Sequence, residues 1–168
     1  GYAWTAEPKC FPTKKFSGYD TANIFITCTD NIRSRLEIWK FLKKTRKENF
    51  NDYLVPIYWM DFGNSQTKGQ VIIGTVREKV LQPSSQEYIP MPKMNVITEE
   101  VDYAKIKEKE SGPSCPLAEA LEKQDLFINS TLAHIGCDIL WRMFKEGKTL
   151  YRGAYINLET LKVTAIPV

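Results

Sequence analysis

The order of apolar and polar residues predicts a strand and then a helix in the first third of the chain. Residues 24–26, Ile-Phe-Ile, form a continuous apolar run, which is typical of a short strand buried on both faces. Asp30 or Asn31 follows where a helix N-cap belongs, because a short acceptor side chain can bond the free amides of the first turn. The next apolar residues recur at helical spacing: Ile32, Leu36, Trp39 and Leu42 or Lys43.

Two more strands and a long connection are predicted in the middle of the chain. Residues 53–63, YLVPIYWMDFG, have the pattern of a buried strand with Pro56 near its start. The turn sequence NSQTKG separates them from QVIIGTV, residues 70–76, so the two strands form either a hairpin or a strand and its return. Residues 77–114 lose periodicity and predict a long loop or crossing segment.

The last third predicts a long helix and a hairpin. One stripe has helical spacing: Leu121, Ile128, Leu132, Ile135, Ile139 and Met143, widened by Phe127, Leu140 and Phe144. This helix, with a break expected near Asp125, should end at Lys145 and Gly147. Residues 149–168 predict a hairpin that turns near Leu158 and Glu159. With a short strand and a loop in residues 1–20, the order of elements indicates a single α/β domain over residues 1–168.

Composition narrows the function classes. The formal charge of +3 does not by itself imply a nucleic-acid partner, and the lysines of KFLKKTRKENF are more typical of the wet face of a helix. No run of residues is long and apolar enough for a membrane span, and no signal peptide opens the chain. The four cysteines lack any Cys-x-x-Cys pair, so neither a zinc site nor a disulfide scaffold is expected, and a reduced, cytoplasmic protein is the default.

Asp30 and Arg35 are the first candidates for chemistry. Asp30 follows the first strand, and the carboxyl edge of an open sheet is where such folds bind ligands. A carboxylate there could hold Mg²⁺ against phosphate oxygens, or it could cap the helix and do nothing more. Arg35 lies one turn further on and could bind phosphate through two donors, although such an arginine is more often a surface charge.

Cys115 is the second candidate, in GPSCPLAEALEKQD. Ser114 has the character of an N-cap, which puts Cys115 at the first helical position, where the helix dipole and free amides favour a thiolate. An inert side chain at a helix start is the alternative. Cys28, which ends a strand, and Cys137, in the apolar helix, are weaker candidates, as is Cys10. His134 is the only histidine, so no Ser-His-Asp or Cys-His arrangement can be assembled.

Three stretches, taken in order, resemble one protein family. CTDNIRSR, residues 28–35, is similar to the CTDNxxxR signature of the ThiF/MoeB family, the bacterial relatives of ubiquitin-activating enzymes. DFGNSQTKGQVIIGTV and GPSCPLAEALEKQDLFINSTLAHIGCDILWRMF resemble the strand pair and the Pro-Ser-Cys segment with the last long helix of that family. PSCPLAEALEKQDLFIN and the late GAYINL are most similar to the ThiF-like proteins of the PRTRC plasmid system.

The resemblance implies an activity and assigns roles to three residues. Members of the family use ATP and Mg²⁺ to adenylate the C-terminal glycine of a ubiquitin-like or sulfur-carrier protein, and they commonly form homodimers. By position, Asp30 matches the aspartate that engages Mg²⁺ and the ATP phosphates, and Arg35 matches the arginine of the signature. Cys115 matches the cysteine that takes the activated partner covalently in ThiF-type members and is not needed for adenylation in MoeB-type members.

The chain also departs from the family pattern. It has neither the N-terminal β-α-β half with a GxGxxG turn nor the paired Cys-x-x-Cys zinc ligands of many relatives. The resemblance therefore implies the C-terminal part of a Rossmann-like ThiF/MoeB sheet, in which Asp30 both caps the helix and faces the metal, and which should be inactive alone. The alternative is a non-catalytic interaction module of a plasmid-borne PRTRC system.

Overall fold

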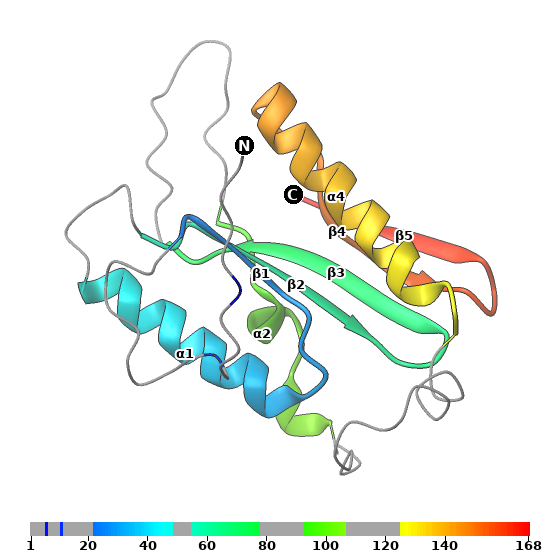
Figure 1. The fold of residues 1–168 in the computed structure, drawn as a ribbon, viewed down its shortest axis with the longest axis horizontal. Helices are drawn as coiled ribbons and strands as arrows, with labels where there is room; N and C mark the ends of the chain where they lie inside the picture. Colours follow the sequence, from blue (N-terminus) through cyan, green and yellow to red (C-terminus); the bar gives the residue numbers. More distant parts are fainter. Residues whose placement is uncertain (1–5, 7–10, 12–21, 49–54, 78–92, 107–124) are drawn as a thin grey trace.

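Five strands form one mixed sheet in the computed structural model, which describes residues 6, 11, 22–48, 55–77, 93–106 and 125–168 (Figure 1). The strands lie in the order of the chain: β1 (Ile24–Thr27), β2 (Tyr58–Asn64), β3 (Lys68–Thr75), β4 (Tyr151–Asn157) and β5 (Lys162–Pro167). The helices are α1 (Ile32–Glu48), α2 (Ile97–Glu100) and α4 (Ile128–Glu146), with a 3-10 turn η2 (Tyr103–Lys105). The expected α/β class is confirmed at this level.

The strand pairing explains which residues share a face of the sheet. β1 and β2 are parallel and are joined through α1, whereas β2–β3, β3–β4 and β4–β5 are antiparallel. The middle strand pair is thus a hairpin, and the predicted C-terminal hairpin is confirmed. The prediction that the first strand is buried on both faces is wrong, because β1 lies at the edge of the sheet and the Ile26 side chain is 54% exposed.

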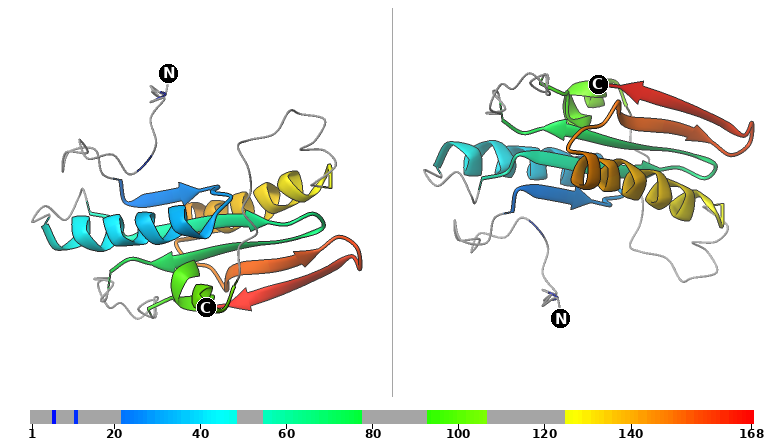
Figure 2. Two further views of the ribbon diagram at one scale, coloured as in Figure 1. Left: turned by 90° about the horizontal axis from the view of Figure 1, so that it is seen from below. Right: turned by 90° about the horizontal axis from the view of Figure 1, so that it is seen from above.

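Helices cover both faces of the sheet, so that the molecule has two hydrophobic cores (Figure 2). Neighbouring residues of β2 belong to different cores: Trp59 lies in the core beneath α1 and α2, and Met60 lies in the core beneath α4. This alternation follows from the two-residue period of a strand. Val96 and Ile97, at the start of α2, join the first core.

Three buried side chains between residues 94 and 97 correct part of the predicted loop over residues 77–114. Met94, Val96 and Ile97 are at most 2% exposed. The Thr75 backbone N–H donates to the Met94 carbonyl, and the Met94 N–H donates to the Thr75 hydroxyl, both at 3.0 Å. This part of the connection is therefore packed against the core, while residues 78–92 and 107–114 of the predicted loop lie outside the described part of the chain.

The buried face of α1 includes Leu42, as predicted, but is otherwise rotated away from the predicted stripe. Its buried positions among the described residues are Arg35, Ile38, Leu42 and Thr45, whereas Leu36 is 47% exposed. The spacing of three and four residues is helical, but the stripe is rotated so that Arg35 points into the molecule. The sequence pattern alone favoured Leu36 because it ranks an arginine as a surface residue.

α4 ends as predicted, but it exposes more apolar surface than expected. It begins at Ile128, and the chain leaves it at Gly147, which has a left-handed backbone with φ of 66°. Ile128, Leu132 and Ile139 are buried, whereas Phe127 and Phe144 are 64% and 70% exposed and do not widen the buried stripe. Leu121 lies outside the described residues.

Candidate functional site

The candidate site begins at the loop that follows β1 and carries Asp30. Asn31 caps α1, since its side-chain oxygen accepts a hydrogen bond of 2.8 Å from the backbone N–H of Ser34. The Asn31 amide nitrogen in turn donates to the Asp30 carboxylate at 2.9 Å. The prediction that Asp30 is itself the cap is wrong: Asp30 supports the capping side chain and is left exposed beside it.

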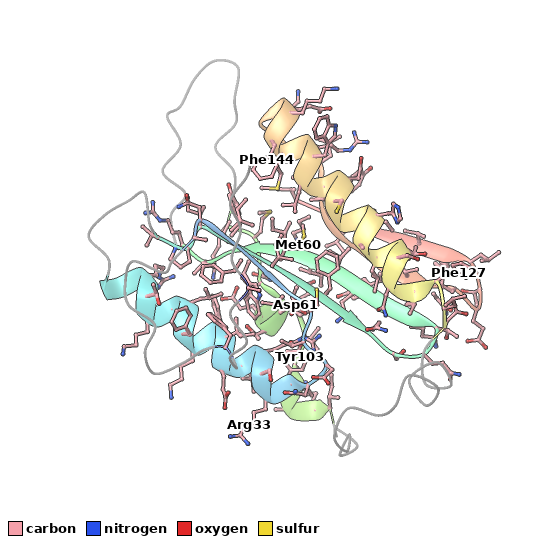
Figure 3. All side chains as sticks on the ribbon, viewed as in Figure 1. Arg33, Met60, Asp61, Tyr103, Phe127 and Phe144 are labelled. Carbon is pink, nitrogen blue, oxygen red and sulfur yellow. The ribbon has the colours of Figure 1, made fainter. Side chains whose placement is uncertain are left out.

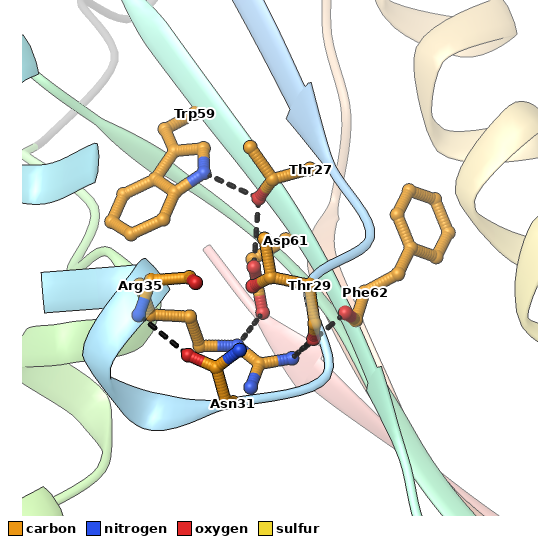
Figure 4. Close-up of polar contacts among 8 residues, drawn as sticks. Thr27, Thr29, Asn31, Arg35, Trp59, Asp61 and Phe62 are labelled. Carbon is orange, nitrogen blue, oxygen red and sulfur yellow. Dashed lines mark hydrogen bonds and ion pairs between the residues drawn. The ribbon is translucent and has the colours of Figure 1, made fainter. Parts of the chain in front are cut away.

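Arg35 is anchored inside the molecule by a carboxylate of β2. The Arg35 Nε atom donates to the Asp61 Oδ2 atom at 2.8 Å, and the two side chains are only 8% and 0% exposed (Figure 4). The Arg35 Nη2 atom donates to the backbone carbonyls of Thr29 and, at 3.0 Å, of Phe62. Arg35 therefore joins the loop before Asp30 to the second strand, and its predicted contact with phosphate stays a prediction.

Asp61 has a second set of contacts on the other side of its carboxylate. The Thr27 hydroxyl donates to Asp61 Oδ1 at 2.7 Å, and the Trp59 indole N–H donates to the Thr27 oxygen at 2.8 Å. Burial raises the pKa of Asp61 above its ordinary range, and the Arg35 charge together with the hydrogen bonds from Arg35 and Thr27 opposes that rise. Three polar side chains from β1 and β2 thus hold the arginine that fixes the loop.

Sequence reasoning missed Asp61, although the chain carries a signal for it. Asp61 interrupts the apolar strand YWMDFG, and a carboxylate in a buried strand requires a hydrogen-bonded cation. A buried arginine on the neighbouring helix is the natural partner. Figure 3 shows the contrast with Arg33, which extends outward from α1; its side chain is 86% exposed and pairs with Glu37.

Asp30 lies where two grooves meet. The first, of about 720 Å³, runs from Asp30 over the sheet toward η2, and the second, of about 520 Å³, lies between β1 and α4. Within the described ranges no cluster of three or more His, Cys, Asp or Glu side chains could hold a metal ion. One carboxylate nevertheless fits Mg²⁺ in the way this ion is usually held with nucleotides, by one or two carboxylates, by phosphate oxygens and by water.

The floor of the first groove is a part of the sheet that none of the described α-helices covers. Gly63, Gln70, Tyr155 and Thr164 are paired neighbours across β2, β3, β4 and β5 and line this groove. Gly63 leaves room for the ends of two side chains, because a Cβ atom there would lie 2.5 Å from Gln70 Nε2 and 2.7 Å from Arg35 Nη2, and one or both would have to move. The floor is therefore made of a glycine and three side chains with polar groups, and it begins at the Arg35 anchor.

The cysteine candidates differ in what the structure shows. Cys115 lies outside the described residues, so its role as a nucleophile stays a prediction. Cys28 and Cys137 are free and exposed, and both line the second groove. Burial, with a smaller contribution from Asp61, raises the pKa of the Cys28 thiol, which makes Cys28 a poor nucleophile at neutral pH. His134 is exposed on α4 and contacts only the Ser130 carbonyl of its own helix among the described contacts.

Comparison with known proteins assigns no family to the chain. No model of a known protein family matches it, and no curated protein matches it. In the described part of the chain, no helix is both long and apolar enough to cross a membrane.

Proposed function

We propose that this chain is part of an ATP-dependent adenylyltransferase that activates the C-terminus of a ubiquitin-like or sulfur-carrier protein. The observation that carries the proposal is the placement of Asp30. It stands at the carboxyl end of β1, on a loop fixed by the buried Arg35–Asp61 pair, at the mouth of a groove with an open sheet floor. An extended protein tail fits such a floor, and the ends of parallel strands are where α/β sheets bind nucleotides.

The proposed chemistry assigns a role to each residue that the family signature matches. A carboxylate oxygen of the partner's C-terminus attacks the α-phosphorus of ATP, the bond to the bridging oxygen breaks, and pyrophosphate leaves. Asp30 would hold Mg²⁺, which when bound neutralises the phosphate charges. Arg35 fixes the Asp30 loop from inside, and its contact with nucleotide is part of the proposal. Cys115 would accept the activated acyl group as a thiolate, with AMP leaving.

Among the described strands none pairs with the outer edge of β1, which supports a sheet that continues beyond them. β1 is parallel to β2, as in a Rossmann-like sheet, and its apolar residues are incompletely covered. The chain has no GxGxxG turn, so we place the nucleotide cradle in a further β-α-β half that pairs with this edge. A homodimer and a cytoplasmic location belong to the same proposal.

Pyrophosphate exchange tests the proposal. The protein as its gene encodes it, supplied with ATP, Mg²⁺ and ubiquitin-like proteins encoded beside it, should exchange labelled pyrophosphate into ATP. Asp30→Ala should reduce the exchange rate at least about a hundredfold, as expected for the loss of a metal-holding carboxylate. Asp138→Ala, which removes an exposed carboxylate on α4, is the control and should leave the rate unchanged. Exchange that survives in Asp30→Ala would remove Asp30 from the site.

The second candidate is a non-catalytic interaction module of a PRTRC-type system. The observation that favours it is the engagement of Arg35 by Asp61 and two carbonyl groups, which gives this arginine a structural task without any ligand. Such a module would bind its partner but show no exchange with any ubiquitin-like protein.

A further inference from the structure

We propose that one surface of the sheet binds an acidic, extended segment of the partner. This surface is on the same face as α1 and α2, but at the end of the sheet that these helices do not cover. The inference rests on the proposed function, since a partner's tail would cross this surface on its way to Asp30. The surface consists of six side chains in two rows and is called the sheet floor below: Lys68, Asn157 and Lys162, and Gln70, Tyr155 and Thr164.

The register of the strands places all six side chains on one face. Lys68 pairs with Asn157 and Asn157 with Lys162, while Gln70 pairs with Tyr155 and Tyr155 with Thr164. Residues two apart in a strand point the same way, so the two rows lie side by side. Two residues further along, Ile72 and Ile166 are buried in the core beneath α1 and α2. The same face is thus packed under α1 and α2 at one end, whereas no described α-helix covers its other end, where the two hairpins extend past α1 (Figure 2).

The charge of the sheet floor selects an anionic occupant. Lys68 and Lys162 are exposed, and neither has an ion pair with another described residue. Asp30 is the single carboxylate among the described residues that line this groove, and the Arg35 charge is already met by Asp61. Unpaired lysines over neutral polar side chains attract an acidic segment and repel a basic one.

The distance between the two lysines predicts how far apart the acidic residues of the bound segment should be. Lys68 and Lys162 lie on β3 and β5, two strand spacings or about 10 Å apart. In a polyproline II segment, which rises about 3.1 Å per residue and has three residues per turn, two acidic residues three positions apart lie on the same side and span about the same distance. The side chains of the sheet floor offer amide, hydroxyl and ammonium groups to a polar extended tail, while Val101, Tyr103 and Ile106 add apolar surface to the same groove.

A charge-reversal experiment tests this docking surface without ATP. The probe is a synthetic peptide, fluorescently labelled at its amino end, with two glutamates three positions apart before a Gly-Gly carboxyl terminus. Matched peptides carry glutamine or lysine in place of both glutamates. Two exposed ion pairs should make the glutamate peptide bind the unaltered protein about five- to tenfold more tightly than the glutamine peptide at low salt, with the difference shrinking as salt is added.

Reversing the two lysines should reverse the preference. The double variant Lys68→Glu and Lys162→Glu should favour the lysine peptide, and its circular dichroism should be unchanged because both lysines are exposed. Lys148→Glu changes an exposed lysine after α4 that does not line the groove, and should keep the original preference. Equal binding of the glutamate and glutamine peptides, or an equal loss in Lys148→Glu, would overturn the proposal. The peptide assay contains no nucleotide, so its result does not depend on whether the protein catalyses pyrophosphate exchange.

Discussion

At the scale of single residues, the Arg35–Asp61 pair governs the candidate site. Both side chains are almost completely buried, so each charge has lost its water and depends on the other. The guanidinium also satisfies the carbonyls of Thr29 and Phe62, which lie on the loop and on β2. The pair therefore couples the position of the loop next to Asp30 to the folding of the first core.

Removing one member of the pair should be far more destabilising than removing both. Asp61→Ala leaves the Arg35 charge buried and should lower the free energy of unfolding by about 3–5 kcal/mol, measured by urea denaturation. Replacing the two together, Arg35→Met with Asp61→Leu, should recover most of that loss because no charge remains buried. The control is Asp138→Ala, which breaks an exposed pair with Arg142 and should cost less than about 1 kcal/mol. Equal losses in Asp61→Ala and Asp138→Ala would contradict the anchoring role.

At the scale of elements, the two neighbouring residues before α1, Asp30 and Asn31, should differ in how much each stabilises the start of the helix. Asn31→Ala removes the cap and should lower the free energy of unfolding by about 1 kcal/mol. Asp30→Ala should cost less, because Asp30 is exposed and only accepts a hydrogen bond from Asn31. Thermal unfolding of the two variants measures the difference. A larger loss in Asp30→Ala than in Asn31→Ala would mean that Asp30, rather than its neighbour, carries the helix start.

Elements whose signal is local could be predicted from the sequence. The β2–β3 and β4–β5 hairpins follow from apolar runs around turn residues, and the end of α4 follows from Gly147. The rotation of α1 was missed because it depends on Asp61, which is 26 residues away along the chain from Arg35 and whose place in an apolar strand is the one sign of the pair in the sequence. Burial of Val96 and Ile97 was missed because a four-residue helix has no periodicity to detect.

The candidate site was predictable only in part, because some of its features depend on residues that are far apart in the sequence. Asp30 and Arg35 could be selected from one short stretch of sequence. That Arg35 points inward, and that Gln70, Tyr155 and Thr164 lie in one row, depends on strand register, which a single sequence does not specify.

At the scale of the whole molecule, the two edges of the sheet differ in their protection. β5 carries Lys162 and Pro167, and such residues discourage pairing with another chain. β1 has the sequence Ile-Phe-Ile-Thr, with neither a charge nor a proline. It also lies next to the apolar groove between β1 and α4. The β1 edge is therefore the place where another strand can add, whether from a further part of the same protein or from a second copy.

This difference predicts how the 168-residue chain behaves by itself in solution. Its apparent mass, measured by light scattering after gel filtration, should rise with protein concentration as β1 edges pair. Ile26→Lys places a charge on that edge and should suppress the rise. It should change the free energy of unfolding by less than about 0.5 kcal/mol, because the side chain is 54% exposed. Val163→Lys is the matched control, since Val163 is 57% exposed on the edge that is already protected, and it should leave the association unchanged. A chain that stays monomeric at every concentration, or an equal effect of both substitutions, would show that the protein does not associate through the β1 edge. The further strands proposed at that edge would then lose their structural support.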